Sequence, residues 1–132
     1  MVDALREAHR AVRQGGTLVD ARPDSRVLAR VEHGGRTVGV VRTQNEERVD
    51  DRASDRAIAH VKRAALFRRL RAGRFWHRIR FSVLAELDVY LAEHGRLEHH
   101  VDWRASTRLR AAWRDDPFTL VRPIRYEVLE RR

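Results

Sequence analysis

Residues 5–23 read LREAHRAVRQGGTLVDARP, and the fold expected for the chain depends on this stretch. Apolar residues recur at helical spacing as far as Val12, and Gly15 and Gly16 end the helix because glycine takes the left-handed cap conformation at little cost. Thr17–Ala21 then predicts a short apolar strand, buried on both faces as parallel strands are. A helix, a Gly-Gly stop and a buried strand are typical of the middle of an α/β protein, yet here they open the chain.

Length and composition predict one folded domain over residues 1–132. The chain is 42% hydrophobic, which favours a globular core over disorder. It has no cysteine, so neither a disulfide framework nor a thiolate metal site is expected. No apolar run has the length of a membrane span, and the N-terminus does not resemble a signal peptide. We therefore expect a cytoplasmic protein without membrane contact.

The charge of the chain raises the question of nucleic-acid binding. The formal net charge is +9 and the isoelectric point about 11.4. However, Lys62 is the only lysine, and such an excess of arginine is what high-GC coding produces without functional demand. The arginines are also spread along the sequence, many beside acids. A small Arg-rich nucleic-acid-binding protein is therefore the alternative rather than the preferred hypothesis.

The remaining sequence predicts mixed strands with an inserted β-hairpin and about four helices in total. The turn His33–Arg36 joins the two strands of the hairpin. In the long helix that comes next, Arg68, Arg69 and Arg71 suit the C-terminal end of the macrodipole, and Gly73 terminates it. The expected segments are the hairpin 27–40, a loop 43–51, a helix 50–70, a strand 75–83, a helix capped by Ser82 and closed by His94-Gly95, a helix 103–114 and a last strand 118–129 with Pro123 at an edge or bulge.

The residues that could carry chemistry are few. No serine lies in a nucleophile elbow, and the histidines His94, His99 and His100 lack a companion motif of metal-ligand spacing. The paired acids sit at turns or helix starts, where they have local roles. Tryptophans interleaved with arginine could stack on bases, but core or rim positions are favoured for Trp76, Trp103 and Trp113. The sequence predicts no catalytic and no metal-binding residue.

Residues 4–23, ALREAHRAVRQGGTLVDARP, resemble the helix and fifth strand of class I S-adenosylmethionine-dependent methyltransferases. In that family an apolar helix ends in R-V-L-R-P-G-G and a strand such as L-V-D comes after it. Residues 11–16 fill the first part, with Gln14 where proline is common, and residues 17–20 fill the strand. Beyond Pro23 the resemblance rests on topology, because a sixth strand and an antiparallel seventh follow the fifth in the family. It implies the C-terminal half of a Rossmann-like α/β sheet, α+β as a fragment.

The resemblance also implies what is missing. In the family the methyl donor needs a Gly-rich turn after the first strand and an acid ending the second, and the sequence has neither. No cofactor-binding residue is carried over, and S-adenosylmethionine is expected only if an N-terminal half completes the domain. Ligands in such sheets lie beyond the carboxyl ends of the strands, so Asp20 and Arg22 would face the substrate side. In the simpler interpretation, Arg22 and Pro23 only steer the chain out of the sheet.

We therefore expect a partial methyltransferase-like domain that is inactive on its own. Two origins fit this expectation: a truncated gene or one with a misassigned start, and a half-domain that persists as a binding or assembly module. A bare strand edge is a liability, so the strand Thr17–Ala21 is expected to pair with a second copy or with a separate N-terminal half.

Overall fold

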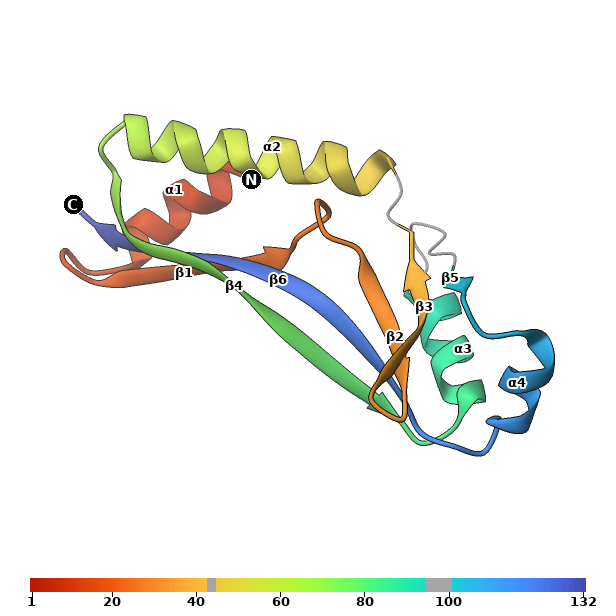
Figure 1. Cartoon of the computed structure of the whole chain (residues 1–132). Coiled ribbons are helices and arrows are strands. Elements are labelled where there is room, and N and C mark those ends of the chain that lie inside the picture. The colour runs from red at the N-terminus through yellow and green to blue at the C-terminus, as the bar shows by residue number, and fades with distance from the viewer. Residues whose placement is uncertain (43–44, 95–100) are drawn as a thin grey trace. The chain divides into compact units, whose positions relative to one another are not determined.

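The computed structural model describes residues 1–42, 45–94 and 101–132, and the side chains of all of these except 45–47. Its described residues form four helices and six strands (Figure 1). In chain order these are α1 (Val2–Ala11), β1 (Thr17–Pro23), β2 (Ala29–His33), β3 (Arg36–Val41), α2 (Asn45–Arg63), β4 (Phe67–Phe81), α3 (Leu84–Glu93), β5 (Val101–Trp103), α4 (Thr107–Ala112) and β6 (Phe118–Arg131).

The six strands form one mostly antiparallel open sheet, so the fold is of the mixed α+β kind. The strand order is β1-β6-β2-β3-β5, and β4 also pairs with β6. Along β6, residues 118–121 pair with β2 and residues 124–130 pair with β1, both antiparallel. Pro123 lies between these two paired segments, so its missing N–H breaks neither ladder. Pro123 was expected at an edge or a bulge, and it lies instead where the pairing partner of β6 changes from β2 to β1.

The chain divides into two compact units. Unit 1 comprises 1–24, 48–75 and 124–132, and unit 2 comprises 25–47 and 76–123. The strands β4 and β6 contribute residues to both units. Each unit has a hydrophobic core of its own.

The core of unit 1 lies between two helices and one face of its strands. Leu5 of α1 and Ile58 and Val61 of α2 pack with Phe67 of β4 and Leu129 of β6, all of them buried. Figure 1 shows α1 and α2 on the same side of β1 and β6. The helical periodicity of α1 therefore buries Leu5, as the sequence predicts.

The core of unit 2 is built around the predicted β-hairpin. Val31 of β2 packs with Phe81, Leu87 and Phe118, and all four are buried. The hairpin turn is confirmed, since Gly34 and Gly35 join β2 to β3 with φ of +56° and +76°. Positive φ at both central residues is what a tight hairpin turn demands and what glycine permits.

Strand β1 differs from the expected parallel strand buried on both faces. It runs to Pro23, pairs antiparallel with β6, and alternates between exposed and half-buried side chains. Leu18 packs on the core of unit 1, whereas Val19 is 59% exposed. An antiparallel strand with one face open to solvent explains the alternation.

The predicted helix 50–70 is wrong at both ends. Helix α2 begins at Asn45, inside the expected loop, and ends at Arg63. Ala65 then takes a φ of +55°, and β4 begins at Phe67. The three arginines expected at a helix terminus, together with Gly73, therefore lie within a strand. The early end of the helix loses helical hydrogen bonds, and the burial of Phe67 beside Leu129 offsets this loss because a large aromatic side chain is removed from water.

Two smaller elements also differ from the prediction. Helix α3 has Val83 rather than Ser82 as its N-cap residue, and the Ser82 amide donates to the carboxylate of Glu86. The helix expected over 103–114 is limited to α4, because Ser106 caps it by accepting from the Leu109 amide at 3.2 Å. Trp103 belongs to β5, beside Gly39 of β3. Gly95 lies outside the described residues.

Candidate functional site

The two residues expected on a substrate side, Asp20 and Arg22, contact each other on β1. The Arg22 Nε donates to Asp20 Oδ2 at 2.9 Å, and the Asp20 and Arg22 side chains are only 13% and 14% exposed. Both residues alternate with the exposed Val19, so they lie on the sheet face that α2 covers. The interpretation that Arg22 and Pro23 turn the chain out of the sheet is wrong, because β1 continues through both residues.

A carboxylate of α2 joins these residues to β6. Asp55 Oδ1 accepts from Arg125 Nη1 at 2.6 Å and from Arg22 Nη2 at 3.4 Å. Arg125 also lies 3.5 Å from Asp51. Arg22 and Arg125 are directly opposite each other in the β1–β6 register, where two like charges repel. Asp55 therefore stabilises a cross-strand pair of arginines that would otherwise be unfavourable.

This group of five residues, Asp20, Arg22, Asp51, Asp55 and Arg125, holds α2 on the sheet of unit 1. Each guanidinium has carboxylate partners, and each carboxylate lies against a guanidinium. Three buried guanidinium nitrogens of this group, Arg22 Nη1 and Arg125 Nε and Nη2, have no hydrogen-bond acceptor within the described part of the chain.

Sequence reasoning located Asp20 and Arg22 at the end of a strand but missed their partners. Asp51 and Asp55 are four residues apart and therefore share one face of a helix, which was an available signal. Arg125 alternates with Tyr126 along a strand, but nothing in the sequence indicates which helix it faces. The pairing of β1 with β6 supplies that information.

Those histidines and paired acids that lie in the described part of the chain form no group with the makeup of a metal site. Within the described ranges, no three His, Asp or Glu side chains are placed to hold a metal ion. His94 stacks on Tyr90 with ring centroids 4.0 Å apart, while His99 and His100 lie outside the described residues. Asp116 contacts His33 at 2.9 Å, which gives that acid a local role.

Trp103 and Trp113 pack on the core of unit 2, whereas Trp76, also expected at a core or rim position, is exposed. Trp103 and Trp113 are half-buried, as expected for core or rim positions, and Trp76 is 41% exposed. The Arg30 guanidinium lies 4.6 Å from the ring centre of Trp76. A cation over an indole ring is favourable by itself, so this contact does not require that Trp76 stack on a nucleic-acid base.

Unit 2 contains a buried carboxylate, Glu32. Burial by itself would raise its pKa, but hydrogen bonds and attraction from Arg30 and Arg78 outweigh that effect and lower the pKa below its ordinary value. The Arg30 Nε donates to Glu32 Oε1 at 2.9 Å, and Arg78 donates to Oε2. Glu32 is thus held ionised between two arginines from different strands, which is a structural role.

Comparison of the chain with protein-family models, with curated proteins and with solved structures finds no match. Among the described residues, no helix is long and apolar enough to cross a membrane. A function for this chain must therefore be inferred from its own sequence and geometry.

Proposed function

We propose that this chain forms the C-terminal half of a class I S-adenosylmethionine-dependent methyltransferase-like domain and has no methyl-donor site of its own. The position of β1 carries the proposal. This strand comes after Gly15 and Gly16, and within the described part of the chain it pairs only with β6. The resemblance implies that the fifth strand of the family is followed by a sixth and by an antiparallel seventh. The antiparallel pairing of β1 with the last strand, β6, supports this correspondence, with β4 in the place of the sixth.

The proposed half-domain would act only in combination with a cofactor-binding half. The sequence offers no glycine-rich turn between a first strand and a helix, and therefore no backbone that could approach the methyl donor closely. Asp20 and Arg22 remain the proposed substrate-side residues. The absence of cysteine fits a cytoplasmic protein.

The outer edge of β1 is the proposed site of assembly. The Arg131 amide donates to the Gly16 carbonyl at 2.9 Å. This hydrogen bond shows which backbone groups along β1 point toward β6. Because antiparallel bonds alternate, the backbone N–H groups of Val19 and Ala21 point away from β6. Val19 is also exposed at its side chain. An open edge of this kind pairs with another strand, and in the isolated chain that strand belongs to a second copy.

Light scattering after size-exclusion chromatography at micromolar concentration tests this assembly. The wild-type chain is expected to elute as a dimer. Val19→Pro removes one outward N–H and leaves the bonds to β6 intact, so this variant is expected to be a monomer. Val19→Thr keeps the N–H and the strand preference and should remain a dimer. A monomeric wild type, or a dimeric Val19→Pro variant, would contradict assembly through this edge.

A further inference from the structure

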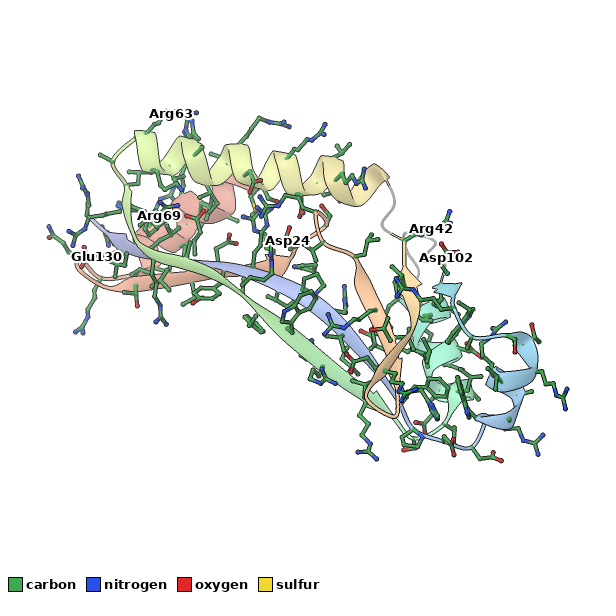
Figure 2. The ribbon with its side chains drawn as sticks, viewed as in Figure 1. Asp24, Arg42, Arg63, Arg69, Asp102 and Glu130 are labelled. Carbon is green, nitrogen blue, oxygen red and sulfur yellow. The ribbon has the colours of Figure 1, made fainter. Side chains whose placement is uncertain are left out.

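Helix α2 places two acids on its sheet side and most of its arginines on its solvent side. Asp51 and Asp55 face the sheet, where both contact Arg125. The solvent face instead bears an exposed basic series, which we call the arginine row: Arg48, Arg52, Arg56 and Arg63, with His60 among them. Figure 2 shows Arg63 projecting from the side of α2 that faces away from β1 and β6.

The arginine row has regular spacing. Its first three arginines are four residues apart, which places successive guanidinium groups about 6 Å further along the helix axis. From Arg48 to Arg63 the row extends for about 22 Å at the rise of an α-helix. Two exposed acids, Asp50 and Asp55, also lie between Arg48 and Arg63, but Asp55 contacts Arg22 and Arg125 rather than the row.

The row has no ion-pair partner among the side chains that the structure describes. None of its four arginines forms an ion pair with a side chain in the described ranges, although α2 itself contains acids. Like charges four residues apart destabilise a helix by about 0.2–0.5 kcal/mol per pair. Arg48 also lies near the N-terminus of α2, where the macrodipole disfavours a positive charge. The row therefore weakens the helix that carries it, and an anionic partner would reverse that effect.

The excess charge of the chain is concentrated in the unit that contains the row. Unit 1 has sixteen Lys and Arg against nine Asp and Glu, a formal net charge of +7, whereas unit 2 has twelve against ten, or +2. High-GC coding would raise the arginine content of both units alike. A charge difference between units is the electrostatic pattern of a surface that meets a polyanion.

We propose that the solvent face of α2 binds the phosphate backbone of a nucleic-acid duplex. Guanidinium groups match phosphate geometry and remain charged at every physiological pH. Contacts of this kind position a duplex without reading its sequence, so binding is expected to be independent of base sequence. An anionic membrane fits less well, because the apolar face of α2 is buried with Ile58 and Val61 in unit 1 and cannot enter lipid. Binding by this face is independent of the methyltransferase proposal.

Fluorescence anisotropy with a labelled DNA duplex of about 20 base pairs and arbitrary sequence tests the proposal. Four phosphate contacts predict a slope of about −3 to −4 in a plot of log affinity against log salt, or about a 100-fold loss of affinity from 50 to 200 mM salt. The test variant, R48A/R52A/R56A/R63A, removes the row. The control variant, R36A/R80A/R104A/R108A, removes four exposed arginines of unit 2 that form no ion pair within the described residues.

The row variant should lose most of the salt-dependent slope, while the control, with the same change in net charge, should keep it. R52A/R56A should lose about half of the slope, because each arginine contributes about 0.9. Alanine is the best helix former, so row variants are expected to be at least as stable to urea as the wild type, which separates lost binding from lost folding. Equal losses in row and control variants would overturn the proposal. So would a wild type that binds phosphatidylserine vesicles but no duplex, or one that binds neither.

Discussion

Asp55 shows how one carboxylate can decide the arrangement of several elements. It lies on α2 and contacts Arg22 of β1 and Arg125 of β6, two arginines that face each other across the ladder. Both arginine side chains are less than 15% exposed, so water screens their repulsion poorly. The position of α2 over β1 and β6 therefore depends on this side chain.

Asp55→Asn should lower the free energy of unfolding by about 1–2 kcal/mol, because it leaves two largely buried guanidinium groups without their shared counter-charge. Urea denaturation followed by circular dichroism measures the change. The control is Asp50→Asn on the same helix, where the acid is exposed and forms no ion pair within the described residues. A control within about 0.5 kcal/mol of wild type is expected, and equal losses in both variants would show that Asp55 has no special role.

Glu32 makes unit 2 sensitive to acid. Its pKa is lowered in the folded state from the ordinary value of 4.5, so its contribution to stability is complete above that value. The contribution is lost as the pH falls through the lowered pKa, when the carboxyl becomes neutral and Arg30 and Arg78 lose their counter-charge. Stability therefore falls, rather than rises, on the acid side.

In Glu32→Gln the glutamine cannot titrate, so its difference from wild type should be largest at neutral pH and should shrink as the pH drops below about 4.5. Urea denaturation at a series of pH values from neutral down into the acid range gives both curves. Curves that remain parallel over this range would mean that Glu32 does not contribute the expected acid sensitivity.

Among the elements, the boundary between α2 and β4 is where sequence reasoning failed. Apolar residues continue at helical spacing from Ile58 to Leu70, and no glycine or proline interrupts them near residue 63. The helix ends because Phe67 is buried against Leu129, a residue more than sixty positions away. Patterns over a few neighbouring residues of the sequence cannot predict a contact between residues so far apart. The hairpin turn at Gly34 and Gly35 was predictable because its conformation is set by the turn residues themselves.

Gly73 in β4 provides a test of the new strand. A Cβ at this position would lie 2.9 Å from the Tyr126 hydroxyl and 3.0 Å from its ring, so the glycine leaves room for the tyrosine to lie across the strand. Arg71 and Phe75 flank the same ring, at 5.8 and 6.3 Å from its centre. The tyrosine therefore covers the glycine between two neighbours on β4.

Gly73→Ala should lower the thermal midpoint and destabilise the chain by about 1–3 kcal/mol, as overpacking does. In a Tyr126→Ala background the same substitution should become neutral or stabilise by up to about 1 kcal/mol, since alanine suits a strand better than glycine. Thermal unfolding of the four proteins in the cycle measures this coupling. The same loss in both backgrounds would mean that the tyrosine does not occupy the space above Gly73.

Over the whole molecule, the sequence predicted an α and β fold with an inserted hairpin and a helix-Gly-Gly-strand start, and these are confirmed. It also located Asp20 and Arg22 on one strand. It could not predict that β1 is antiparallel, because alternation over five residues does not identify a neighbour. It also missed the unequal charge of the two units, although most of the excess was visible in the sequence: segment 48–75 has nine Lys and Arg against three Asp, which supplies +6 of the +7 of unit 1.

The whole chain is proposed to be a methyltransferase-like half without a methyl-donor site. Isothermal titration of the purified wild-type chain with S-adenosylmethionine and with S-adenosylhomocysteine tests this proposal most directly. We expect no binding of either compound, because the sequence offers no Gly-rich turn between a first strand and a helix and no acid ending a second strand of that kind. Micromolar binding of either compound would contradict the proposal, since the chain would then build a cofactor site by itself.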